Sequence, residues 1–192
     1  MNVSQTEAQE SLSTVHDVTV QTHRAIASVY ANPLLILWGL LWIIAFTAAH
    51  FYLAYDFHIF MVMGVAGGIG TAVVCWVFHS KAPVQDTSYP RVGWRIASFW
   101  ILLYVYVTIW LFLLAPFNGL QCNAVISTAA MFAYTVIGLW FGSYFMVLLG
   151  LTVTVATLVG FYILTPYYCL WMALTGGGAM LGTGLYIRLR WR

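Results

Sequence analysis

Five side chains that could bind a metal ion fall near the ends of predicted membrane helices. His50 and His58 flank a short turn that contains Asp56, and Cys122 and Cys169 lie near the ends of two later apolar segments. Imidazole, carboxylate and thiolate are the ligand types that zinc and other transition metals use. No pair has a tight ligand spacing within one helix, and the two thiols could instead form a disulfide on an oxidising outer face. His50 and His58 are therefore only weak candidates for a metal or haem site, and we predict no bound cofactor.

The apolar interior of the chain offers no acid–base chemistry. From Ile96 to Ile187 the sequence contains no Asp, Glu, Lys, Arg or His. An ionisable group inside a bilayer costs about 2.5–3.5 kcal/mol on insertion scales, so it is kept only where it is used. Its absence argues against proton-coupled transport, membrane redox relays and hydrolysis, which needs a carboxylate or histidine beside the nucleophile. We predict that the protein is not an enzyme.

The composition is that of an integral membrane protein. Hydrophobic residues make up 62% of the chain and charged residues only 6%, and the mean hydropathy is +0.89. A soluble domain carries about a quarter charged residues because its surface must contact water. The few basic residues form no patch suited to nucleic acid. The predicted partners are therefore the lipid bilayer and other membrane helices.

Hydropathy and turn residues predict an all-α bundle of six membrane helices arranged as three hairpins. A proline follows a helix-capping residue at Asn32–Pro33 and at Thr165–Pro166, which is typical of a helix start. Asn118–Gly119 and Gly142–Ser143 are typical turns. We expect spans 2 and 6, which are rich in small residues, to be buried. The six spans cover about 33–53, 58–79, 95–115, 120–140, 144–164 and 167–187.

The distribution of charge predicts the orientation of this bundle. A six-span arrangement places all seven Lys and Arg residues on one face, and Asp56 is the one charge on the opposite face. The positive-inside rule makes the basic face cytoplasmic. We predict that both termini are cytoplasmic, that residues 1–32 form a polar tail able to form an amphipathic helix, and that residues 33–192 form the membrane domain.

Small residues in spans 2 and 6 predict close helix packing. Small residues four apart in the sequence let helix backbones approach, and van der Waals contact then drives association in lipid. The same faces could join the protein to a partner or to a second copy. The alternative interpretation is a glycine hinge or an unwound segment at a binding site. The predicted packing residues are Gly64, Gly68 and Ala72 in span 2, and Gly176, Gly177, Gly178 and Gly182 in span 6.

Span 4 carries one small, mildly polar face and one apolar face. One interpretation is a helix that lines a path for a solute. The other is that the threonine hydroxyls bond to preceding carbonyls of their own helix while the small face packs against a neighbour. The candidate solute-lining residues are Gln121, Thr128 and Thr135 in span 4, and Thr154 and Thr157 in span 5.

The segments 168–178 (YCLWMALTGGG) and 138–142 (GLWFG) resemble those of a group of small bacterial six-span membrane proteins. These proteins have no assigned activity, and some of them are labelled transporters. The resemblance implies a bacterial origin, and hence the cytoplasmic (inner) membrane. It provides no catalytic or binding residue.

Three functions fit these observations. The first is a non-enzymatic assembly, accessory or signalling partner in the membrane, which is favoured by the lack of membrane chemistry and the rich packing surface. The second is a small permease or channel for a neutral or apolar solute, using the polar face of span 4. The third and weakest is a metal- or haem-associated subunit that uses His50 and His58.

Overall fold

A computed structural model describes residues 32–81, 89–116 and 118–190. Every regular element in these ranges is helical, which confirms the predicted all-helical class for this part of the chain. The predicted amphipathic helix within residues 1–32 and much of the predicted loop at 80–94 lie outside the described residues. The predicted helix start at Asn32–Pro33 lies at their edge.

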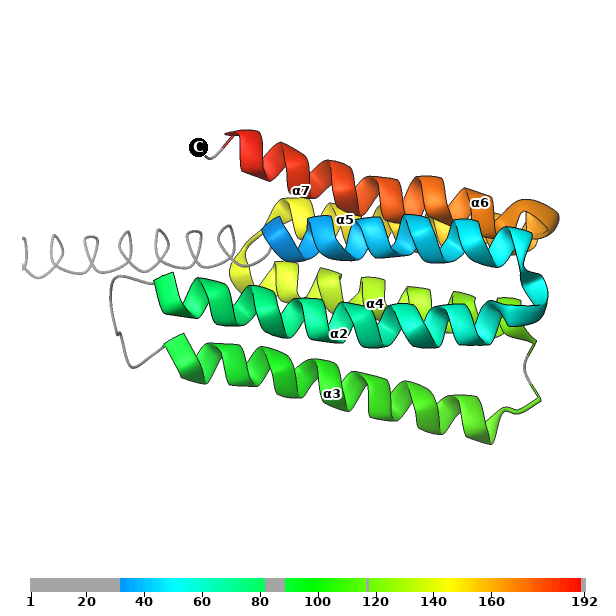
Figure 1. The fold of residues 1–192 in the computed structure, drawn as a ribbon, viewed down its shortest axis with the longest axis horizontal. Helices are drawn as coiled ribbons and strands as arrows, with labels where there is room; N and C mark the ends of the chain where they lie inside the picture. Colours follow the sequence, from blue (N-terminus) through cyan, green and yellow to red (C-terminus); the bar gives the residue numbers. More distant parts are fainter. Residues whose placement is uncertain (1–31, 82–88, 117, 191–192) are drawn as a thin grey trace, which may run out of the picture.

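Among the described residues, five helices are long and apolar enough to cross a membrane. The first described helix, Asn32–Phe51, leads through the 3-10 turn η1 to α2. Near the C-terminus α6, a π-helical turn η3 and α7 follow one another without a break and form a sixth rod (Figure 1). The remaining bounds are η1 Leu53–Tyr55, α2 Asp56–Lys81, α3 Tyr89–Leu113, α4 Gly119–Phe141, α5 Tyr144–Tyr162, η2 Thr165–Tyr167, α6 Tyr168–Met172, η3 Ala173–Gly177 and α7 Gly178–Arg190.

Two predicted turns form through local side-chain and backbone geometry. Asn118 caps α4 because its side-chain oxygen accepts a hydrogen bond from the Gln121 backbone N–H at 2.8 Å. The Gln121 side chain accepts one from the Asn118 N–H at 3.1 Å, which completes a capping box. Gly142 ends α4 with φ of 64°, a left-handed conformation that glycine adopts without steric cost. The predicted cap at Thr165 is wrong: Thr165 begins η2, and its hydroxyl donates to the Phe161 carbonyl instead.

The core joins Asn32–Phe51, α4, α5 and the α6–α7 rod. Phe46 is 2% exposed and makes edge contacts with Trp42, Phe60 and Tyr168. These aromatic rings connect the first described helix to α2 and α6. Large side chains at this junction bury the apolar surface that holds the four inner rods together.

The helices α2 and α3 lie at the periphery. In the apolar 18-residue stretch of each helix, only 6% of the residues of α2 and none of those of α3 are buried, whereas 39% of those of α4 are buried. Figure 1 shows α3 at one edge of the bundle and the α6–α7 rod at the opposite edge. The expectation that span 2 is buried is therefore wrong, because no other part of the described chain covers the outer side of α2.

Candidate functional site: helix-contact faces and an apolar groove

Glycines of the last rod make backbone contact with the first described helix. A Cβ atom on Gly177 would lie 2.7 Å from Ile43 Cγ1, 2.9 Å from the Ile43 nitrogen and 3.0 Å from the Gly39 oxygen. A Cβ on Gly39 would lie 2.6 Å from the Leu181 nitrogen. Farther along, a Cβ on Gly184 would lie 2.8 Å from Ile36 Cγ1. The predicted packing glycine Gly177 thus contacts a glycine, Gly39, that was not among the predicted packing residues.

The π-helical turn η3 coincides with this close approach. Gly176 lies against the Trp42 ring, since its Cβ would be 3.0 Å from two ring carbons. Inside the turn the Thr175 hydroxyl donates to the Trp171 carbonyl at 2.7 Å. A π turn is one residue wider than an α turn and mostly occurs as a single turn inside an α-helix. The Thr175 bond has the same i to i−4 pattern as the threonine bonds in α4 and α5.

Two other predicted packing glycines on this rod contact no neighbouring helix of the described bundle. No atom of the described chain beyond the local backbone lies within 4 Å of a Cβ placed on Gly178 or Gly182. Their lack of a side chain is therefore not used for packing within the described bundle.

The same division occurs on α2. Gly67 and Gly70 pack against the first described helix, where a Cβ would lie 2.5 Å from Trp38 and 2.8 Å from Leu37. The Trp38 indole N–H also donates to the Thr71 hydroxyl at 3.1 Å. The predicted packing residues of α2 lie on a different side of this helix. The large side chains of Trp38 and Leu37 require small residues on the helix that faces them. The sequence contains both sets of residues, but only the tertiary structure shows that Gly67 and Gly70 lie opposite these side chains.

The predicted α2 residues form an outward face. Gly64 and Gly68 have no atom of the described bundle, outside their own backbone surroundings, within 4 Å of a Cβ, and Ala72 is exposed. Their spacing of four places them on one side of the helix. We call Gly64, Gly68 and Ala72 the α2 outer face.

The threonines of the predicted solute-lining face bond to their own helices. Thr135 donates to the Met131 carbonyl at 2.9 Å, and Thr157, fully buried, donates to Val153 at 2.8 Å. Thr128 and Thr154 make equivalent bonds to Ala124 and Gly150. Gln121 uses its side-chain oxygen in the α4 cap. These contacts match the interpretation in which the hydroxyls satisfy preceding carbonyls.

The small face of α4 packs tightly on α5. A Cβ on Gly138 would lie 2.8 Å from the Val147 nitrogen, and one on Gly150 would lie 2.6 Å from the Met131 oxygen. The Thr135 hydroxyl also lies against Gly150. The face of α4 that a solute path would need is therefore occupied by its contact with α5.

One buried polar group was missed by the sequence analysis. Tyr168 is 1% exposed, and its hydroxyl has no hydrogen-bond partner in the described structure. Ser127, 2% exposed, is the polar side chain beside it. Ser127 lies three residues after Ala124 and four before Met131, so helical spacing places it beside the predicted solute-lining face, but it was not among the predicted residues.

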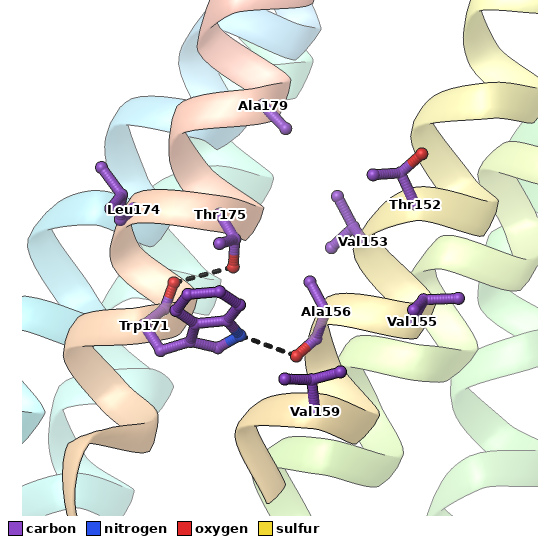
Figure 2. Close-up of a pocket in the computed structure, with 9 residues that line it drawn as sticks. All are labelled: Thr152, Val153, Val155, Ala156, Val159, Trp171, Leu174, Thr175 and Ala179. Atoms are coloured by element: carbon purple, nitrogen blue, oxygen red, sulfur yellow. Dashed lines mark hydrogen bonds between the residues drawn. The ribbon is translucent and has the colours of Figure 1, made fainter. Parts of the chain in front are cut away.

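Figure 2 shows a groove between α5 and the last rod. Its volume is about 600 Å³, and apolar side chains form most of its walls. The Trp171 indole N–H donates to the Ala156 carbonyl at 2.8 Å, so the ring bridges the two helices at one end of the groove. Small side chains, Ala156 on α5 and Thr175 and Ala179 on the rod, leave the space between them.

The candidate metal ligands remain dispersed. His50 stacks at 6.5 Å on Tyr167, and His58 contacts the rings of Tyr55 and Phe57. Both Cys122 and Cys169 are free thiols. Among the residues that could be searched, no three His, Cys, Asp or Glu side chains come together as a metal site.

Asp56, by contrast, has a structural contact. Its carboxylate accepts a hydrogen bond from the Phe57 N–H and lies against Gly119, the first residue of α4. A negative charge at a helix N-terminus is favourable because the free backbone N–H groups carry partial positive charge. Asp56 thereby links the start of α2 to the start of α4.

The chain matches no protein-family model, no curated protein and no solved structure. Its function must be inferred from its own geometry.

Proposed function

We propose that this protein is a non-enzymatic membrane component that assembles with another membrane protein, or with a second copy of itself, through the α2 outer face. The observation that carries the proposal is the open space beside Gly64 and Gly68 on a helix that is only 6% buried. Small residues allow the backbone of a second helix to approach closely, and this contact drives association in lipid.

The interior of the bundle supports this role over transport. A solute path along α4 would need hydroxyl groups free to exchange hydrogen bonds with the solute. Thr128 and Thr135 instead bond to their own helix, and Gly138 and Gly150 close the space beside them. The permease interpretation therefore has less support than the assembly role.

The proposed arrangement has six spans with both termini in the cytoplasm of a bacterial cell. In Figure 1 the start of the first described helix and the end of α7 lie at the same end of the bundle, together with the end of α2 and the start of α3. Basic residues lie at or near these four points in the sequence. A cytoplasm-active reporter fused after Arg192 should be active, and inactivity there would contradict this orientation.

Photo-crosslinking in intact membranes tests the assembly role. A photoreactive amino acid in place of Ala72 should give a discrete protein adduct, whose mass distinguishes a second copy from another protein. The same amino acid in place of Leu148, which is 65% exposed on α5, is the matched control. Adding Gly68→Leu should reduce the adduct at position 72. Equal labelling at both positions, with no discrete adduct, would contradict the proposal.

A further inference from the structure

The groove between α5 and the last rod exists because small side chains face each other across it. Ala156 of α5 lies opposite Thr175 and Ala179, and none of them is long enough to fill the space (Figure 2). Beside them Gly178 has open space where a side chain would be. The volume of about 600 Å³ falls within the range of about 300–1,000 Å³ typical of ligand sites.

The walls of the groove favour an apolar ligand. Its two bridging polar groups already have partners within the chain, because Trp171 donates to the Ala156 carbonyl at 2.8 Å and Thr175 donates to the Trp171 carbonyl at 2.7 Å. Thr152, which is exposed, adds one hydroxyl at the opposite end of the groove. A polar ligand would leave most of its own hydrogen-bonding groups unpaired against these walls, which costs free energy.

The position of the groove along α5 indicates that its ligand comes from the membrane. Its α5 wall runs from Thr152 to Val159, in the middle and second half of a helix long enough to cross a membrane. At 1.5 Å per residue this wall is about 10 Å long and parallel to the helix axis. Leu174 at its edge is 73% exposed and faces the surroundings of the bundle. The groove therefore opens toward hydrocarbon, whose core is about 30 Å thick.

We propose that this groove binds one acyl chain of a membrane phospholipid. The Trp171 ring closes one end, so the groove ends after about 10 Å. A transmembrane helix of another protein would continue past this point and could not be seated along its length. The terminal part of an acyl chain lies near the middle of the bilayer, so it can enter the groove from the open end beside Thr152, in the middle of α5, and end against the indole.

Electron spin resonance with chain-labelled phosphatidylcholine tests the proposal in phosphatidylcholine bilayers. Ala156→Phe and Ala179→Phe fill the groove from opposite walls. Each should lower the motionally restricted lipid population by about one chain per protein relative to the unmodified protein. The control Ala97→Phe changes an exposed alanine on α3 and should leave that population unchanged.

Two results would overturn the proposal. One is an unchanged restricted population in both groove variants, with each variant eluting from gel filtration as the unmodified protein does. The other is a change in oligomeric state in the groove variants without loss of restricted lipid, which would mean that a protein segment occupies the groove. Using two walls protects the test, because a folding defect in one variant leaves the other to decide.

Discussion

At the scale of single residues, the glycines of this protein divide into those that touch a neighbouring backbone and those that do not. Gly177 and Gly39 belong to the first group, and Gly178 and Gly64 to the second. The sequence shows where glycine is frequent but cannot separate the groups, because the difference depends on which helix lies opposite. Spacing alone therefore selected Gly64 on α2, whereas Gly67 makes the contact.

Gly177→Ala should destabilise the protein, and Gly178→Ala should not. The new methyl group at position 177 would meet backbone atoms of Ile43 and Gly39 at 2.9 and 3.0 Å, and backbone cannot rotate away. Overpacking of this kind costs about 1–3 kcal/mol. At position 178 there is space, and alanine is the better helix former by up to about 1 kcal/mol. Thermal unfolding in detergent micelles measures both, and equal midpoints for the two variants would contradict the assigned contact.

Tyr168→Phe should leave stability unchanged or raise it. The tyrosine hydroxyl is buried without a hydrogen-bond partner, and a buried unpaired polar group costs about 1–3 kcal/mol. Phenylalanine removes that group and keeps the ring that contacts Phe46. The same unfolding assay decides the sign. A clear loss of stability would show that the hydroxyl does have a partner.

At the scale of helices, local signals predicted the boundaries of α4 and α5 to within two residues, whereas α3 begins at Tyr89, six residues before the predicted start. The prediction of 144–164 for span 5 compares with Tyr144–Tyr162, and that of 120–140 for span 4 with Gly119–Phe141. Asn118 and Gly142 act on their own neighbouring backbone, so their effect can be read from sequence. The π turn at Ala173–Gly177 could not be predicted, because it accompanies a contact with a helix more than a hundred residues earlier.

Asn118→Ala tests the capping of α4. The substitution removes the acceptor of the Gln121 N–H and breaks the reciprocal pair of hydrogen bonds. Loss of a helix N-cap costs about 0.5–2 kcal/mol. The control Asn123→Ala changes an asparagine inside the same helix and should have a smaller effect on the unfolding midpoint. An effect of the same size in both variants would contradict a specific role for the cap.

At the scale of the whole molecule, four tightly packed rods carry two peripheral helices. The inner rods use glycines and aromatic rings for contact, and the threonine hydroxyls on α4 and α5 bond within their own helices. The α2 outer face meets no other part of the described bundle. The helix α3 contacts α4 along one side, where Phe99 and Trp100 meet the rings of Trp140 and Tyr134. Composition predicted the membrane class, but only the tertiary arrangement reveals which helix faces have no neighbour within the described residues.

The mass of the protein in its native lipid environment tests this account most directly. Particles extracted from cells with a polymer that keeps the surrounding lipid should contain more protein mass than one chain of 21.5 kDa. Gly68→Leu, which fills the α2 outer face, should return the protein mass to that of one chain. A single chain in the unmodified particles, indistinguishable from Gly68→Leu, would contradict the central claim that α2 binds a partner.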